Sequence, residues 1–422
     1  MKRFILQLAF LPMLAFGQTL EECQQAAERN YPLIRQYGLI ERTTDITVAN
    51  IQKGWFPQVS ASAQATYQSD VTAFPDEIGK MYQQMGVAMK GLEKDLYRLG
   101  IDVQQTVYDG GNIRSQKEIA RRQGEVEAAQ NDVKIYNVRR RVNEMYFALL
   151  LVDEQIKLNS DLQQLLVSNE KKLESMVREG TAAESDRQNV KAERLKNAQQ
   201  MTNLQSQRTA LVRMLSTFCG IDMKEAVRPE ADVLDPNGGN NRPELKAIDA
   251  QLRLADSREK ALDAALRPRF GIFAQVFYGY PGYNMFEDMM EHKFSLNATI
   301  GARLTWNIGS LYTRKNDKAK INLQRETAYL NRDRFLFDNN LEQIQQNEKI
   351  ERFRKLLADD DEIIALRSSI RKAAESRLEH GIIDVNDLLS EINNENAARV
   401  QQSIHGIEML KEIYELKFIT NQ

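Results

Sequence analysis

The chain has 422 residues, of which 42% are hydrophobic and 27% are charged, and its formal net charge is −2. A near-neutral chain with no concentrated basic surface gives no reason to expect nucleic acid as a partner. After the N-terminus, no apolar run is long enough for a transmembrane helix, so the composition indicates a helix-rich, well-solvated protein.

The first seventeen residues (1–17) have the pattern of a secretory signal peptide. Lys2 and Arg3 precede an apolar run over residues 4–16, and the small residue Gly17 suits a cleavage site. The alternative is a buried N-terminal helix. Export is the prediction that the charge and length of this segment favour.

The chain has two cysteines, Cys23 and Cys219. Leu20, Glu21 and Glu22 precede Cys23, which is unlike the small and apolar residues before a lipidated cysteine. In an exported chain the two cysteines can pair. A disulfide and two free buried thiols both remain open from the sequence.

The first half of the chain predicts helix, two strands and two long helices. Residues 20–53 are helical in pattern, and alternating apolar and polar residues predict strands at 58–68 and 99–108. The stretch between these strands is expected to be a long loop with a helical piece near residues 80–97. Asn112 to Glu179 contains no proline, and Gly180 ends this long helix before a second one over residues 184–217.

The long helix carries a coiled-coil seam, because its apolar residues step alternately by four and three positions. These are Val138, Val142, Met145, Leu149, Val152 and Ile156. A spacing of 3.5 residues keeps one face against a neighbouring helix.

The second half repeats the first after a polar, glycine-containing linker at residues 229–241. The first repeat is predicted to span residues 18–228 and the second residues 242–422. Two proline-containing sites recur at one constant spacing, Pro32 with Pro243 and Pro57 with Pro268.

Within the second repeat, strands are expected at residues 270–280 and 293–307. Helices follow at about residues 313–379 and 384–416, with a turn glycine at Gly381 that matches Gly180.

Residues 293–307 alternate strictly between apolar and polar side chains. The apolar set is Phe294, Leu296, Ala298, Ile300, Ala302, Leu304 and Trp306. Such segments, set among long charged helices, are typical of outer-membrane barrel strands that face lipid on one side and a lumen on the other. Four strands cannot close a barrel, so this interpretation requires other copies of the chain.

The signal peptide, the duplicated helix–hairpin–helix order, the prolines before the strands, the Tyr108-Asp109-Gly110-Gly111 turn and the turns at Gly180 and Gly381 together resemble the TolC-like outer-membrane efflux proteins. The resemblance spans essentially residues 18–422. It implies a mainly α fold with β, in which long helical hairpins form a periplasmic α-barrel. It also implies a homotrimer whose twelve-stranded β-barrel, four strands from each chain, lies in outer-membrane lipid of a Gram-negative bacterium.

The resemblance also implies a passive exit duct for efflux or type I secretion. Its expected partners are a periplasmic adaptor protein and an inner-membrane pump or ABC transporter. The alternative function is an exported periplasmic coiled-coil adaptor, which the two pairs of alternating strands disfavour.

In this family the helix turns contact the tip of the adaptor. The matching residues of this chain are Gly180, Thr181, Ala182, Ala183, Gly381, Ile382 and Ile383. An acidic ring narrows the entrance, and Asp186 and Asp387 stand six residues after the turn glycines, with Asp384 nearby. Relatives with a charged closing latch have an aspartate where this chain has Ser390 and an arginine at the position of Ile383.

The three aspartates also have a simpler interpretation, because aspartate is favoured at a helix N-terminus. Aromatic residues near the strand ends are predicted to form a membrane-interface girdle, with ordinary packing as the alternative: Trp55, Tyr67, Tyr278, Tyr280 and Trp306. No cluster of residues with metal-ligand, phosphate-loop or catalytic spacing is present in the sequence, so we expect no enzyme, no metal and no cofactor.

Overall fold

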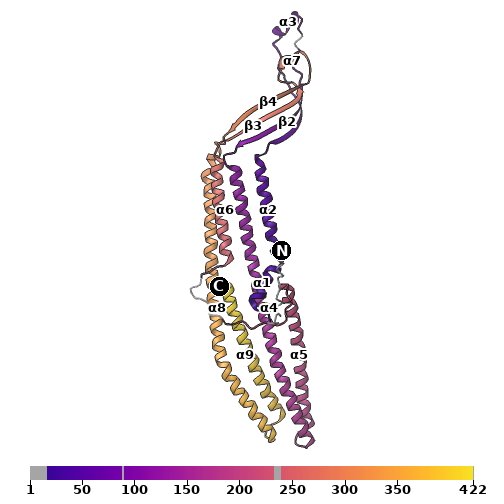
Figure 1. The fold of residues 1–422 in the computed structure, drawn as a ribbon, viewed down its shortest axis with the longest axis vertical. Helices are drawn as coiled ribbons and strands as arrows, with labels where there is room; N and C mark the ends of the chain where they lie inside the picture. The colour runs from indigo at the N-terminus through magenta and orange to yellow at the C-terminus, as the bar shows by residue number, and fades with distance from the viewer. Residues whose placement is uncertain (1–16, 88–89, 232–238, 422) are drawn as a thin grey trace, which may run out of the picture. The chain divides into compact units, whose positions relative to one another are not determined.

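The computed structural model describes residues 17–87, 90–231 and 239–421 (Figure 1). Most of the predicted signal peptide lies outside these residues. The chain forms two compact units, and each draws on both sequence repeats. Of the described residues, unit 1 contains 17–37, 129–231, 239–247 and 331–421, and unit 2 contains 38–87, 90–128 and 248–330.

Unit 2 contains one antiparallel sheet of four strands in the order β1-β2-β3-β4. The strands are β1 (Gln58–Tyr67), β2 (Asp95–Tyr108), β3 (Arg269–Tyr280) and β4 (Ser295–Thr305). Figure 1 shows β2, β3 and β4 lying side by side. The two hairpins expected from the sequence therefore form a single sheet, joined through the pairing of β2 with β3.

The second strand begins earlier than the sequence predicts, at Asp95 rather than at residue 99. Its first residues pair with the end of β1, with Tyr67 opposite Asp95 and Thr66 opposite Leu96. Leu96 falls on the polar face, so the apolar alternation starts only beyond it. Backbone pairing extends the strand where the side-chain pattern gives no signal.

The two hairpin loops each contain a short helix. The first loop holds α3 (Asp76–Gln84), which shares only residues 80–84 with the helical piece predicted near residues 80–97. The end of that predicted piece belongs to β2 instead. The second holds α7 (Met285–Met290), which the sequence analysis did not predict. Asn284 caps α7 by accepting a hydrogen bond from the Glu287 backbone, and six residues are too few for a helical periodicity to show.

Unit 2 also contains most of α2 (Ile34–Gln52) and α6 (Pro243–Ala265), together with the first part of α4 (Asn112–Arg178) and of α8 (Ser310–Glu379). Ion pairs between α6 and α8 hold these helices together. Arg325 contacts Asp256 at 2.7 Å and Glu259 at 2.6 Å.

Unit 1 contains α1 (Leu20–Asn30), α5 (Glu184–Cys219) and α9 (Val385–Thr420) with the remaining parts of α4 and α8. Its largest apolar cluster joins α1, α4, α5 and α9. The predicted seam contributes to this cluster, with Val138, Val142 and Leu149 buried. The long helix and its packing face are thus confirmed.

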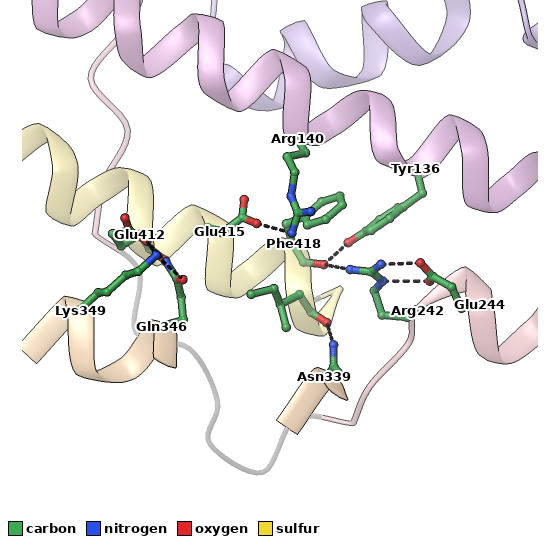
Figure 2. A network of polar contacts seen from close by, with 11 residues as sticks. Tyr136, Arg140, Arg242, Glu244, Asn339, Gln346, Lys349, Glu412, Glu415 and Phe418 are labelled. Carbon is green, nitrogen blue, oxygen red and sulfur yellow. Dashed lines mark hydrogen bonds and ion pairs between the residues drawn. The ribbon is translucent and has the colours of Figure 1, made fainter. Parts of the chain in front are cut away.

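The last turn of α9 is fixed by a polar network (Figure 2). The Phe418 carbonyl accepts hydrogen bonds from Tyr136 at 2.7 Å and from Arg242 at 3.2 Å. Asn339 donates to the Ile419 carbonyl at 2.8 Å. The last carbonyls of a helix lack intrahelical partners. Here the side chains of Tyr136 in α4, Asn339 in α8 and Arg242, which directly precedes α6, donate to them.

The helix–strand–strand–helix–helix order occurs twice along the chain, as predicted. α2, β1, β2, α4 and α5 correspond to α6, β3, β4, α8 and α9, while α1 has no counterpart in the second half. Among the described residues, no helix is both long and apolar enough to cross a membrane.

Candidate functional sites: helix turns and an amphipathic sheet

The two predicted turn glycines have left-handed backbones, with φ of 74° at Gly180 and 70° at Gly381. In both turns the residue after the glycine donates its backbone N–H back across the helix end. Thr181 donates to the Met176 carbonyl at 2.8 Å, and Ile382 donates to the Arg377 carbonyl at 2.9 Å. This arrangement satisfies helix-end carbonyls and needs a glycine at the left-handed position.

The aspartates after these turns act in helix capping. Asp384 is the N-cap of α9 and accepts from the Asp387 backbone at 3.0 Å. Asp186 lies in the first turn of α5 and accepts from the Ala183 backbone at 3.1 Å. The capping role is therefore present at Asp384 and Asp186, while Asp387 is exposed. The acidic entrance ring stays a prediction.

The two turns belong to the same unit and pack against each other. Leu173 of α4, Val190 of α5 and Val385 of α9 share one buried cluster. Asn189 donates to Asn386 at 3.4 Å, and Figure 1 shows α5 returning alongside α4 and α9 alongside α8. The two turns, one from each repeat, therefore lie next to each other in unit 1.

The exposed residues of this site are mixed in chemistry. Ile382 has 70% of its surface exposed although it is a large apolar residue. Thr181 and Ala183 are exposed, whereas Ile383 and Ala182 lean against the buried clusters of the helix ends. The turns therefore expose both apolar and polar groups at positions that the glycine backbone defines.

The sheet of unit 2 is amphipathic on all four strands. Directly paired residues of an antiparallel sheet lie on the same face, and the register places these apolar residues together: Val59, Ala61, Ala63, Ala65, Tyr97, Leu99, Ile101, Val103, Ile272, Ala274, Val276, Tyr278, Leu296, Ala298, Ile300, Ala302 and Leu304. Leu296 is 73% exposed and Ile300 83% exposed. No side chains of the described chain cover this face at those positions.

The opposite face is polar and carries arginines stacked on phenylalanines. Arg98 lies over the ring of Phe277 at 3.8 Å and donates to Gln275 at 2.8 Å. Arg303 lies over the ring of Phe273 at 4.9 Å. A cavity of about 440 Å³ lies over this face where the strands meet the start of α4. The face combines charged groups with a rigid sheet, as a water-filled lumen requires.

Four of the five predicted girdle aromatics have accessible surface, and one does not. Tyr67, Tyr278 and Trp306 are 75%, 53% and 57% exposed, and Trp55 is half-buried. Tyr280 is only 1% exposed. The girdle itself remains a prediction for the four accessible residues.

The prediction that Tyr280 belongs to the girdle is wrong, because Tyr280 is buried between the two hairpin loops. Its hydroxyl accepts from the Glu93 backbone at 2.9 Å, and the His292 ring lies 4.1 Å from its own. The buried ring thus packs against another ring, and the hydroxyl keeps a hydrogen-bond partner inside the protein. The sequence placed it at a strand end, but the contacts from the second loop could not be foreseen.

A charged cluster between α8 and α9 was not identified from the sequence. Glu395, whose side chain is 6% exposed, pairs with Arg371 and with Arg399, the latter at 2.7 Å. Burial opposes the charged form, but hydrogen bonds from Arg399 and Arg371 outweigh it and lower the pKa of Glu395. The four-residue spacing of Glu395 and Arg399 on one helix could have indicated their ion pair. Arg371 belongs to another helix, and no local pattern in the sequence indicates its pairing with Glu395.

The cysteines occur as free thiols, both buried. Among the described residues, no group of histidine, cysteine, aspartate or glutamate side chains is arranged to hold a metal ion. The structure therefore presents two candidate sites, the helix turns of unit 1 and the sheet of unit 2.

No protein-family model and no curated protein sequence matches this chain. Solved structures do match, each over 95% of the chain. The outer-membrane channel OprN is 16% identical, with a TM-score of 0.63 and 89% of its own chain covered. CusC, described for its folding and transmembrane channel formation, is 11% identical, with a TM-score of 0.66 and 91% covered.

The MtrE outer-membrane channel of Neisseria gonorrhoeae, in its open state, is 14% identical, with a TM-score of 0.63 and 88% covered. Each of these likenesses covers nearly the whole chain. They confirm the mainly helical, internally repeated architecture with a four-stranded sheet. The chain has the fold of the TolC-like outer-membrane channels.

Proposed function

We propose that this protein is an outer-membrane channel that provides a passive exit duct across the outer membrane and the periplasm. The observation that carries the proposal is the four-stranded sheet, whose exposed face is apolar on every strand and whose other face is polar. A soluble protein rarely leaves so large an apolar surface in water. Lipid on one side and an aqueous lumen on the other account for both faces.

Three copies of the chain complete the channel in this proposal. The sheet ends at β1 on one side and β4 on the other, so both edges have unpaired backbone groups. Such edges are not tolerated inside a lipid bilayer. Pairing β4 of one copy with β1 of the next closes a barrel, and three copies of four strands give twelve.

The localisation follows from the same surfaces. An exported chain with an amphipathic sheet belongs in the outer membrane of a Gram-negative bacterium, and its long charged helices suit the periplasm. The adaptor alternative fits less well, because both strand pairs join one sheet with a continuous apolar face.

The helix turns of unit 1 are proposed to dock a periplasmic adaptor, which connects the channel to an inner-membrane pump or ABC transporter. The support is the left-handed glycine backbone of both turns and the exposed Ile382 of the second turn. Asp186 and Asp387 lie one helical turn further along. Repeated on three chains, they place several carboxylates near the entrance.

The proposed function is tested by fractionating cells and extracting the protein from the outer membrane in detergent. We expect a particle with threefold symmetry in negative-stain images and a mass about three times 48.5 kDa. A monomer in the soluble periplasm, or a protein retained in the inner membrane, would contradict the proposal.

Adaptor docking has its own test. Ile382→Asp places a charge on the exposed apolar residue of the turn, and we expect it to abolish co-purification of the adaptor while the trimer persists. Leu195→Asp is the matched control, because Leu195 is an exposed apolar residue of α5 away from the turn. Equal adaptor recovery from all three proteins would remove the turn from the docking site.

A further inference from the structure

The two cysteines of this chain lie together in the core of unit 1. Cys23 is in α1 and Cys219 is the last residue of α5, and the two are 0% and 2% exposed. Both belong to the same apolar cluster, where Cys23 Sγ also lies 3.8 Å from Met223 Sδ. The only two cysteines of a 422-residue chain, one near its start and one near its middle, thus occupy one small volume.

The two thiols share one buried environment. Both side chains belong to the same apolar cluster, which also contains Met223. Interaction with Cys219, together with burial, raises the pKa of the Cys23 thiol, while interaction with Cys23 lowers the pKa of the Cys219 thiol.

The helices that carry the cysteines are held in register on either side of them. Asn30 at the end of α1 donates to the carbonyls of Thr217 and Phe218, each at 3.2 Å. Before α1, the Gln18 backbone donates to the Glu225 carbonyl at 3.0 Å. These contacts fix α1 against the end of α5, so the approach of the two thiols is a consequence of the fold.

We propose that Cys23 and Cys219 form an intramolecular disulfide in the exported protein. The inference rests on the proposed function in one respect only, namely export to an oxidising compartment. Two thiols become one disulfide by losing two protons and two electrons, and an oxidised protein disulfide of that compartment accepts them and leaves as a dithiol. Since both sulfurs are buried in the folded chain, this exchange takes place before α1 packs onto α5.

The disulfide fastens α1 to the rest of unit 1. α1 is the helix without a counterpart in the second repeat, and its buried residues Leu20, Cys23 and Ala27 pack onto α4, α5 and α9. A covalent link across nearly the whole first repeat restricts the unfolded chain strongly. The link therefore adds a covalent bond to the packing and the hydrogen bonds that hold the N-terminal segment.

The test maps the bond in protein taken directly from cells. Cells are denatured in excess iodoacetamide, and the protein is digested with trypsin without reductant. We expect a linked pair joining the peptide that ends at Arg29 to the peptide Met214–Lys224, with no alkylation at either cysteine. Recovery of both cysteines as alkylated thiols from outer-membrane protein would overturn the disulfide and leave the channel proposal intact.

A second measurement covers the case in which the protein is not exported. Purified protein is unfolded and refolded in a buffer of reduced and oxidised glutathione, and the same peptides are analysed. The linked pair supports the disulfide whatever the localisation, and its absence after refolding overturns it. Thermal unfolding gives a third measurement. Dithiothreitol should lower the melting temperature of the native protein and leave that of the Cys23→Ser/Cys219→Ser double variant unchanged.

Discussion

Single residues decide which face of the sheet meets which solvent. Neighbouring positions of one strand point to opposite faces, so Ala61 lies on the apolar face opposite Ile101 and Ser62 on the polar face opposite Gly100. All four residues are within one short ladder. The same substitution at adjacent positions therefore probes two different environments.

Arginine on the apolar face should impair insertion. We expect Ile300→Arg and Ala61→Arg to destabilise the inserted state by roughly 2–4 kcal/mol near the bilayer midplane, because the charge must leave water. Ser62→Arg is the control and should be tolerated. Heat-modified mobility and urea unfolding in lipid vesicles measure the effect, and equal losses on both faces would refute the assignment of the faces.

The buried carboxylate of Glu395 should make unit 1 sensitive to acid. Its pKa is lowered, because the hydrogen bonds from Arg399 and Arg371 outweigh burial. A lowered pKa gives stability that is present above the ordinary glutamate pKa of about 4.3 and is lost as the pH falls through the folded value. The arginines then lose their charged partner.

Glu395→Gln should cost about 2 kcal/mol at pH 7 and should flatten the decline of stability in acid, because a neutral side chain has no proton to gain. Glu408→Gln is the control, since Glu408 forms a more exposed pair with Lys411 at 3.3 Å. Melting temperatures at pH 7 and at about pH 3, which is below the ordinary glutamate pKa, compare the three proteins. An unchanged acid response in Glu395→Gln would assign the sensitivity to other groups.

At the scale of whole elements, the helix turns depend on backbone conformation more than on packing. A Cβ atom at Gly180 or Gly381 would meet no neighbouring heavy atom within 4 Å. Any cost of substitution there comes from the left-handed backbone itself. The turn glycines therefore differ from glycines that are needed because another chain segment packs closely against their backbone.

Gly180→Ala should therefore destabilise the protein by roughly 1–2 kcal/mol, the cost of placing an L-residue in a left-handed conformation. Gly38→Ala is the matched control, because Gly38 lies in α2 with open space around it, and alanine favours a helix. We expect opposite signs in thermal unfolding. A stabilising effect at Gly180 would show that the turn can adopt another conformation.

Most elements could be predicted from the sequence because their signals are local. Glycines and prolines mark the ends of the long helices, and strict alternation marks β1 and β4. The start of β2 was missed because Leu96 interrupts the alternation, and α7 because it is too short to show a period. The burial of Tyr280 and the pairing of Arg371 with Glu395 depend on segments far apart in sequence, which no local pattern reports.

At the scale of the molecule, the internal repeat brings two turns with similar chemistry into one unit. The aspartates after these turns come from α5 and α9. In the proposed trimer each chain contributes both, so the charge at the entrance is multiplied threefold. Ion preference is thus a property of the assembly rather than of one chain.

The double variant Asp186→Asn/Asp387→Asn should weaken the preference for cations in single-channel recordings, because it removes two carboxylates per chain. Asparagine is also favoured at a helix N-terminus, so the turns should remain folded. Asp45→Asn, the same change at an exposed residue of α2, should leave the reversal potential unchanged. An unaltered preference in the double variant would place these aspartates away from the ion path.

The network around the last turn of α9 has a consequence for biogenesis. Arg242 is buried, and it depends on Glu244 and on the Phe418 carbonyl for its hydrogen bonds (Figure 2). The Tyr136 hydroxyl donates a hydrogen bond to the same carbonyl. Since a ribosome adds residue 418 long after residues 136 and 242, this part of the core closes only at the end of synthesis. A chain that ends before residue 418 should therefore leave Tyr136 without its hydrogen-bond acceptor and Arg242 with Glu244 as its remaining hydrogen-bond partner, which makes this part of the core less stable.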